Sequence, residues 1–98
     1  LEFSEKSLAV TKGENIHFTV KRRESSSPLE AKISIQPGTG VHGVVYRDEI
    51  QVLVFQVGET EKKLTLPTLY FAGDKSLDFY LNLTVDGQLV DQLQVQVS

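Results

Sequence analysis

The sequence predicts an all-β protein, an antiparallel β-sandwich of about seven strands, and two observations lead to that prediction. Apolar residues recur at every second position in several short segments, most cleanly at 16–20, 29–35, 77–85 and 93–97. Turn-forming residues separate these segments, and no stretch shows the apolar period of a helix long enough to matter. We therefore expect two packed sheets in one domain.

Size and composition set limits on the class of protein. The chain has 98 residues, which suits a single domain over residues 1–98. It contains no Cys, Met or Trp, so we expect no disulfide and no cysteine-ligated metal. Because Met is absent even at position 1, we expect the domain to be a piece of a longer multidomain protein. No apolar run reaches the roughly 20 residues of a membrane span, which argues against membrane insertion.

The charge of the chain points away from polyanionic partners. A formal net charge of −3 gives no electrostatic basis for binding nucleic acid or an anionic membrane. The one basic cluster, Lys21-Arg22-Arg23, is followed at once by Glu24. Three charges neutralise few phosphates, so we interpret the cluster as a solvated strand end.

The first third of the chain reads as a broken strand, a turn and a regular strand. Residues 1–10 have short apolar steps, and we place them along a sheet edge. The turn at 11–15 has Gly13 as its residue of positive φ. In the strand at 16–20, His17 falls on the polar face, and no second ligand is near it in sequence. His17 is therefore interpreted as an exposed strand histidine and not as a metal ligand.

Loops on either side of the next strand carry no site that we can identify. Residues 24–28 hold three serines and a proline, which favour a flexible connection over a nucleophile. The strand that follows ends at Pro37-Gly38, a strong turn dipeptide. The loop at 39–43, which includes His42, is glycine-rich, but no helix follows it, so a phosphate site is not predicted. Extended chain resumes at 44–46, before three charged residues.

The stretch from Leu53 to Pro67 reads as strand, tight turn and strand. Gly58 provides the permissive backbone for the turn, and Pro67 ends the second strand. We expect these two strands to pair as a hairpin. The first of them is partly apolar on both faces, which suits the middle of a sandwich or a strand covered by a loop.

The last third contains the strongest short hairpin signal. Asp86-Gly87 separates two alternating strands, as in a two-residue turn. The alternation changes phase in the second of these strands, so we expect a β-bulge near Val90 or Asp91.

Three motifs, taken together, resemble those of a Calx-β domain. The stretch from Leu53 to Pro67 reads Leu-x-Phe-x-x-Gly-Glu-Thr-x-Lys-x-Leu-x-Leu-Pro, close to the family pattern Leu-x-Phe-x-x-Gly-Glu-x-x-Lys-x-Ile-x-Val. Phe79-x-Leu81-x-Leu83 resembles a later family strand. Phe3, Gly13 and the ending Val20-x-Arg22 resemble the family's opening segment. The resemblance implies an immunoglobulin-like sandwich, often present in tandem copies in surface proteins.

The same resemblance implies where calcium would bind, and the chain departs from the family there. Calcium-binding members have an Asp before a Tyr after the third strand, where this chain has Val45-Tyr46. They have consecutive Asp residues after the fifth strand, where this chain has Leu69-Tyr70-Phe71. Thr11-Lys12 stands where an acidic residue is usual before the first turn glycine. The acids left near these loops are scattered, namely Asp48, Glu49, Asp74 and Asp78. Calcium needs several converging carboxylates, so we expect no high-affinity calcium site and no cofactor.

Catalysis has little support in the sequence. Only His17 and His42 could serve as histidine bases, and neither lies in a nucleophile motif. Asn82-Leu83-Thr84 forms a sequon, which makes Asn82 a candidate glycosylation site on the polar phase of its strand. Glutamines of the last strand, with Tyr80 and Thr84 beside them, form a polar face that fits solvated sheet or a sugar or protein partner.

We therefore expect a non-catalytic structural or adhesive module of a larger cell-surface or secreted protein. It would hold its ends at a fixed separation, and its partners would be other domains of the same chain or another protein. Two alternatives remain open, a ligand-binding module for calcium or carbohydrate and an accessory domain of an enzyme. Flanking sequence would discriminate between them.

Overall fold

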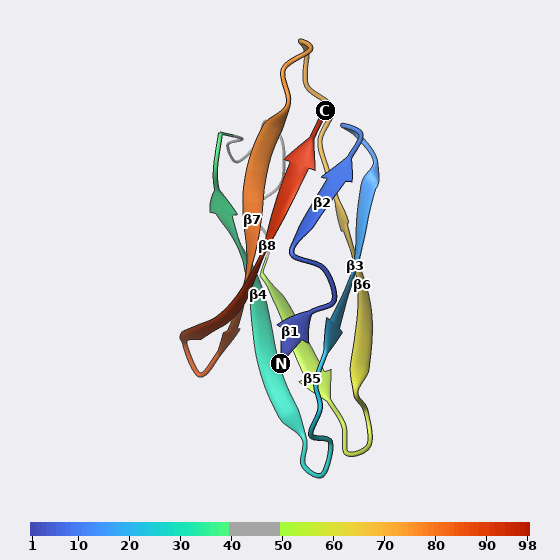
Figure 1. Ribbon diagram of the computed structural model, residues 1–98, viewed down its shortest axis with the longest axis vertical. Helices are drawn as coiled ribbons and strands as arrows, with labels where there is room; N and C mark the ends of the chain where they lie inside the picture. The colour runs from blue at the N-terminus through green and yellow to red at the C-terminus, as the bar shows by residue number, and fades with distance from the viewer. Residues whose placement is uncertain (40–49) are drawn as a thin grey trace.

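The computed structural model describes residues 1–39 and 50–98, and it confirms an all-β sandwich (Figure 1). The described residues form eight strands, one more than about seven, because the broken first strand forms two separate elements. The strands are β1 (Glu2–Phe3), β2 (Ser7–Val10), β3 (Asn15–Lys21), β4 (Leu29–Pro37), β5 (Gln51–Phe55), β6 (Glu61–Pro67), β7 (Leu77–Val85) and β8 (Gln88–Val97).

Two sheets lie face to face in a body whose extents are 48 × 21 × 17 Å. The smaller sheet has the strand order β1-β3-β6, and the larger has the order β2-β8-β7-β4-β5. Neighbouring strands are antiparallel, as predicted, with the exception of β2 and β8, which are parallel. The antiparallel prediction therefore holds for most of the sandwich and fails at one pair.

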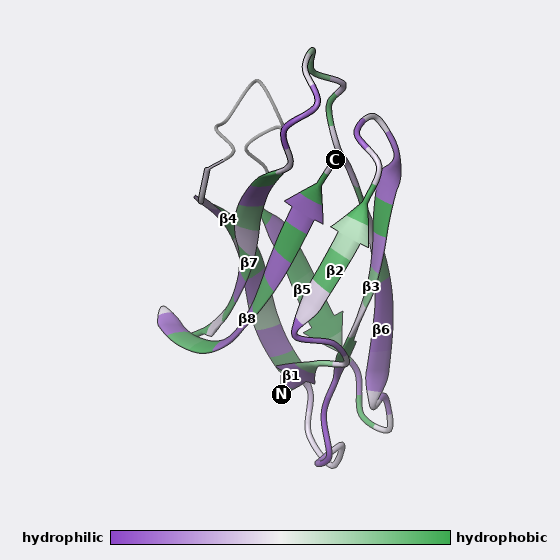
Figure 2. Ribbon diagram, turned by 45° about the horizontal axis from the view of Figure 1, so that its top comes forward, coloured by the Kyte–Doolittle hydropathy of each residue, from purple (hydrophilic) through white to green (hydrophobic). Residues whose placement is uncertain are grey.

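The core lies between the sheets and consists of the residues that the alternation predicted. Figure 2 shows the alternating apolar and polar bands along β7 and β8. Inward side chains of β3, β7 and β8 are almost fully buried, because each strand turns one face to the opposite sheet. The buried residues of these three strands are Ile16, Phe18, Val20, Phe79, Leu81, Leu83, Leu93, Val95 and Val97.

The predicted hairpin between Leu53 and Pro67 is wrong. β5 pairs with β4 in the larger sheet, whereas β6 pairs with β3 in the smaller sheet. The turn itself was predicted correctly: the Glu59 N–H donates to the Gln56 carbonyl at 3.0 Å, and Gly58 has a φ of 88°. Glycine adopts that φ without steric cost, as a type II turn requires. A tight turn fits an arch between two sheets as well as a hairpin, so the turn signal alone could not separate them.

Of the two positions expected for β5, the middle of the sandwich is not the one found, since β5 is the edge of the larger sheet among the described strands. Its outward residues Val52 and Val54 are 54% and 43% exposed. The apolar character of both faces therefore reflects an edge strand with an exposed apolar face.

The hairpin of β7 and β8 has the predicted turn and the predicted bulge. Asp86 and Gly87 both have positive φ, as in a type I′ turn. Leu83 lies opposite Asp91 and Thr84 lies opposite Leu89, so Val90 is the extra residue of the bulge. The tip of this hairpin projects away from the body (Figure 1).

The first two strands lie on edges, as predicted, but on edges of different sheets. β1 pairs with β3 in the smaller sheet, and β2 pairs with β8 in the larger. The chain between them therefore crosses from one sheet to the other. The expectations for His42, for the extended segment 44–46 and for the charged residues 47–49 lie outside the described residues.

Candidate functional site

The candidate glycosylation residue Asn82 lies in a small network of amide side chains on the outer face of the larger sheet. Its Nδ2 donates to Gln36 Oε1 at 3.0 Å, and its Oδ1 accepts from Gln92 Nε2 at 2.9 Å. The strands on both sides, β4 and β8, supply these two partners. Asn82 is half-buried on the predicted outward phase. A glycan on Nδ2 would leave one N–H to donate to Gln36, and glycosylation stays a prediction.

A second cluster on this face fixes the end of β4. Asp78 Oδ1 accepts from the Thr39 N–H and hydroxyl, each at 2.7 Å, and Gln94 donates to Oδ2 at 3.1 Å. These hydrogen bonds, those from Thr39 first, hold the pKa of Asp78 below its usual value. Gly38 makes the approach feasible, because a Cβ there would lie 2.5 Å from Asp78 Oδ1 and 2.8 Å from the Asp78 carbonyl. The carboxylate of Asp78 therefore serves to fix the backbone at the end of β4.

The basic cluster Lys21-Arg22-Arg23 was predicted to be a solvated strand end. Lys21 and Arg23 are exposed, as predicted, but the prediction is wrong for Arg22. Arg22 is buried, and its guanidinium donates to three backbone carbonyls, those of Glu59 at 2.7 Å, Ser27 at 2.8 Å and Gln56 at 2.8 Å. It also lies 5.1 Å from the centroid of the Phe55 ring. Arg22 thus ties the β3–β4 loop to the turn after β5.

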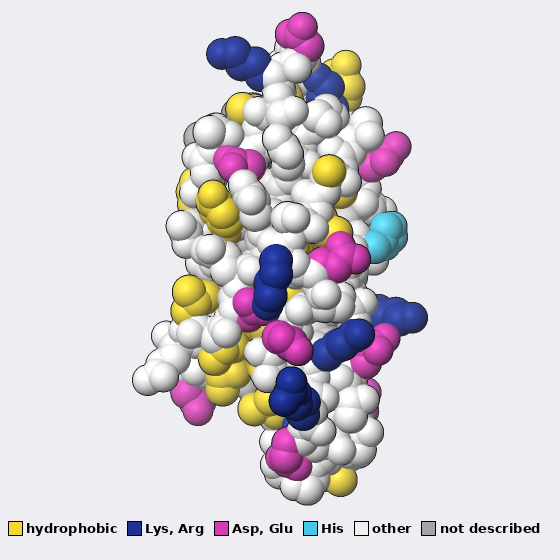
Figure 3. All heavy atoms as spheres, viewed as in Figure 1, with side chains coloured by type: hydrophobic (Ala, Val, Ile, Leu, Met, Phe, Trp, Pro, Cys, Tyr) yellow, Lys and Arg dark blue, Asp and Glu magenta, His cyan; other side chains and the backbone are white. Residues whose placement is uncertain are grey.

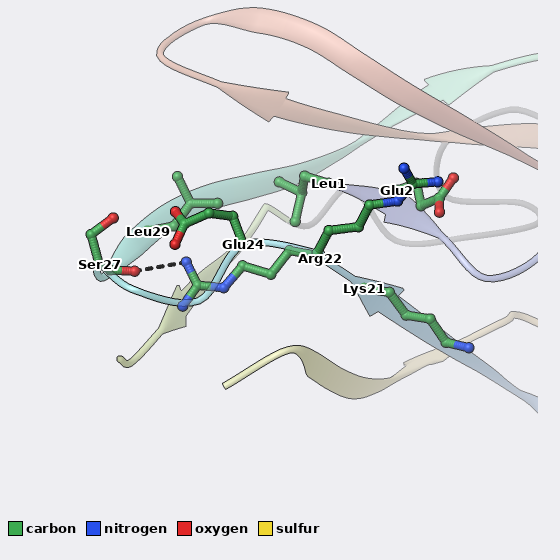
Figure 4. Close-up of a pocket in the computed structure, with 8 residues that line it drawn as sticks. Leu1, Glu2, Lys21, Arg22, Glu24, Ser27 and Leu29 are labelled. Carbon is green, nitrogen blue, oxygen red and sulfur yellow. Dashed lines mark hydrogen bonds between the residues drawn. The ribbon is translucent and has the colours of Figure 1, made fainter. Parts of the chain in front are cut away.

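A groove of about 560 Å³ lies beside Arg22 at the same end of the sandwich (Figure 4). Its lining mixes apolar and charged side chains of both signs. In Figure 4, Arg22 points to Ser27 and Lys21 points away from it. The residues around the groove are Leu1, Glu2, Lys21, Arg22, Arg23, Glu24, Ser27 and Leu29. Each of the three guanidinium nitrogens of Arg22 donates to a backbone carbonyl, so this side chain is held by the two loops beside the groove.

Asp91 holds the crossing of the first strand between the sheets. Its Oδ2 accepts from the Phe3 N–H and from Lys6 Nζ, each at 2.8 Å. Burial raises the pKa of Asp91, but the hydrogen bonds from Lys6, Phe3 and Gln92 outweigh it and leave the pKa below its usual value. The signal for Asp91 and Arg22 was present in the sequence: both continue the inward phase of their strands, where a charged residue must be paired.

The loops that the family resemblance associates with calcium carry a lysine. The β2–β3 turn and the segment after β6 lie against each other, since Thr68 donates to the Glu14 carbonyl from both its N–H, at 3.1 Å, and its hydroxyl. Lys12 Nζ donates to the Gly73 carbonyl and lies 4.7 Å from the centroid of the Phe71 ring. Within residues 1–39 and 50–98, no three His, Cys, Asp or Glu side chains gather to hold a metal ion. Residues 45–49, which include Asp48 and Glu49, lie outside the described residues, so the absence of a high-affinity calcium site stays a prediction.

The remaining candidates give no reactive arrangement. His17 is exposed on the outer face of the smaller sheet, as predicted, and its Nδ1 lies 3.1 Å from Thr65 Oγ1. Figure 3 shows acidic and basic side chains interspersed over one face of the molecule, without a patch of a single sign. No helix in the described part of the chain is long and apolar enough to cross a membrane.

Comparison with solved structures identifies the fold. The crystal structure of the calcium binding domain CBD12 of CALX1.1 matches with a TM-score of 0.86 at 18% identity, over 98% of this chain and 42% of that one. The apo-form Calx CBD1 domain matches with a TM-score of 0.84 at 16% identity, over 97% and 91% of the two chains. The periplasmic chaperone SfaE matches with a TM-score of 0.61 at 14% identity, over 97% and 55%. Neither a protein-family model nor a curated protein sequence matches the chain.

The predicted resemblance to a Calx-β domain is therefore confirmed at the level of the fold. At these identities, what the calcium-binding domains do is not carried over to this chain.

Proposed function

We propose that this Calx-β-like sandwich is a non-catalytic structural or adhesive module of a larger cell-surface or secreted protein. The module separates neighbouring domains and presents a sheet face or loops to other domains or to another protein. One observation carries the proposal. The most strongly bonded charged side chains, Arg22, Asp78, Asp91 and Lys12, are used to fix backbone segments.

The shape supports a spacer. The body is more than twice as long as it is wide, at 48 Å against 21 Å. The amino terminus lies in the lower half of the molecule and the carboxyl terminus in the upper part, so the chain enters and leaves at different levels of the long axis (Figure 1). A sandwich with a continuous buried core resists bending, so neighbours joined to the two termini keep a defined separation.

The proposal is tested on the parent protein. Small-angle scattering of the module together with its natural neighbours should give an extended particle with a narrow distribution of domain separations. Antibody labelling of intact cells should reach the module without permeabilisation. A catalytic neighbour whose kcat/KM falls when the module is deleted would instead favour an enzyme accessory domain, and labelling only after permeabilisation would exclude a surface location.

A carbohydrate-binding role is the second candidate, and the amide face favours it. Gln36, Asn82 and Gln92 present linked donors and acceptors, and Tyr80 lies next to them in register on β7. Amide groups and an aromatic ring can together bind a sugar by hydrogen bonds and stacking. Glycan-array binding that is lost in Tyr80→Ala and Gln92→Ala, but kept in His17→Ala on the other sheet, would establish this role. Absence of binding to any glycan leaves the spacer proposal in place.

A further inference from the structure

Three separate parts of the chain meet at Lys12. Its backbone N–H donates to the Ser98 carbonyl at 2.9 Å, which ties the β2–β3 turn to the end of β8. Its ammonium donates to the Gly73 carbonyl in the segment between β6 and β7. The same ammonium lies 4.7 Å and 5.4 Å from the ring centroids of Phe71 and Tyr70. One side chain thus contacts the loop that no strand pairing holds.

We propose that the Lys12 ammonium is a built-in cation that closes this loop end without a metal ion. Aromatic ring faces carry negative charge density and attract a cation within about 6 Å. A carbonyl oxygen adds a charge-assisted hydrogen bond. Phe71 is 8% exposed, so the cation faces a ring that is packed in the core. Carbonyl and rings thus form a site that fits an ammonium.

The same surroundings are unsuited to a divalent ion. Calcium takes six to eight oxygen ligands, several of them from carboxylates. The Glu14 carbonyl already accepts two hydrogen bonds from Thr68, and Tyr70 and Phe71 turn ring faces, which are not oxygen ligands, toward the ammonium. A fixed positive charge on Lys12 would also repel a dication a few ångströms away. The lysine therefore replaces the metal in holding the loops and also opposes its binding.

A covalently attached cation has a consequence that a bound one does not. A metal-held loop opens and closes with the concentration of the metal, whereas the ammonium of Lys12 is part of the chain and is present at every metal concentration. The loop end of this module is therefore closed constitutively. This inference does not depend on the spacer proposal, because it concerns only how the loops are held.

The test compares Lys12→Met, which keeps the length of the side chain and removes the charge, with Lys12→Arg, which keeps the charge. Lys75→Met is the matched control, since Lys75 is an exposed lysine of the same loop. Amide hydrogen exchange of Glu14 and Thr68, whose N–H groups donate to the carbonyls of Thr11 and Glu14 at this loop end, is measured for each protein in chelator and in millimolar calcium. We expect exchange of these two amides to become about tenfold faster in Lys12→Met, and to stay close to wild type in Lys12→Arg and Lys75→Met. Wild-type exchange and Tm should be the same with calcium and with chelator.

Three results would overturn the proposal. The first is a Lys12→Met variant whose loop exchanges no faster than that of Lys75→Met. The second is an equal loss of protection in Lys12→Met and Lys12→Arg, which would assign the effect to packing instead of charge. The third is a rise in wild-type Tm or loop protection on adding calcium, and this measurement stands even if the Lys12 variants do not fold. Failure here would leave the scattering and labelling results on the parent protein unaffected.

Discussion

Replacing Arg22 by methionine removes a guanidinium that is 8% exposed and donates to three backbone carbonyls. Methionine keeps much of the apolar stem, so the change isolates the polar contacts and the contact with the Phe55 ring. The three carbonyls belong to two loops from different parts of the chain. Their loss should therefore loosen the whole lower end of the sandwich.

The magnitude follows from the contacts. A hydrogen bond from a charged donor contributes about 1.5–3 kcal/mol, and a partly buried cation–π contact adds about 1 kcal/mol. The contacts share one side chain and do not add fully, so we expect Arg22→Met to lower the free energy of unfolding by roughly 3–4 kcal/mol. Lysine cannot reach all three carbonyls at once, so Arg22→Lys should lose about 2 kcal/mol. Exposed Arg23 is the control, and Arg23→Met should stay within about 0.5 kcal/mol of wild type.

Urea unfolding with linear extrapolation measures these differences. With an m-value of about 1–1.5 kcal/mol/M for a chain of this size, Arg22→Met should move the midpoint down by about 2–4 M. The m-value itself should not change. A loss below about 1 kcal/mol in Arg22→Met, or full stability in Arg22→Lys, would refute the assignment of Arg22 as the residue that ties the two loops.

Three further predictions concern single residues. The pKa of Asp91 is lowered by folding, so its contribution is present above the usual carboxyl pKa of about 4 and is lost as the pH falls through the lower folded value. Asp91→Asn should therefore reduce stability by about 1–2 kcal/mol at neutral pH and flatten the acid limb of a stability profile, whereas an unchanged acid limb would contradict the role of Asp91. Gly38→Ala should cost roughly 1–3 kcal/mol in urea unfolding, because its Cβ would meet the Asp78 carboxylate and carbonyl; a stability equal to wild type would show that β4 can shift freely. A glycan on Asn82 would appear by mass spectrometry of protein secreted from eukaryotic cells and would vanish in Thr84→Val, and unmodified protein would leave Asn82 as a structural amide.

The alternation of apolar residues was sufficient to predict the sandwich, its core and the bulge at Val90. Pairing was harder, because a reversal of direction looks the same in sequence whether the next strand joins the same sheet or the opposite one. The turn at Gly58 was therefore predicted correctly and its two strands were assigned to one sheet wrongly. Strand partners depend on contacts between distant residues, which local patterning does not encode.

The structural roles of some polar residues could be predicted from local patterning, and those of others could not. Arg22 and Asp91 could have been found, because Asp91 occupies an inward position of β8 and Arg22 continues the inward phase of β3 directly after its last residue. Lys12 carries no such signal, since its role depends on rings 58 and 59 positions further along the chain that only folding brings near. A charged residue in the apolar phase of a strand should therefore be interpreted first as a buried residue that fixes the backbone, and only then as a surface residue.

The parallel pairing of β2 with β8 sets how the module would respond to tension. Ser7 to Val10 lie beside Gln94 to Val97 in the same direction, and the pairing is extended by hydrogen bonds from Gln94 to Lys6, from Ser98 to Val10 and from Lys12 to Ser98. Pulling the amino-terminal chain against the carboxyl-terminal chain drives the two strands past each other along their length. All of their hydrogen bonds then carry the load together, whereas a hairpin pulled at its open end breaks one bond at a time. Among the strands that the structure describes, the one pair that departs from the antiparallel arrangement is thus the pair placed to bear force.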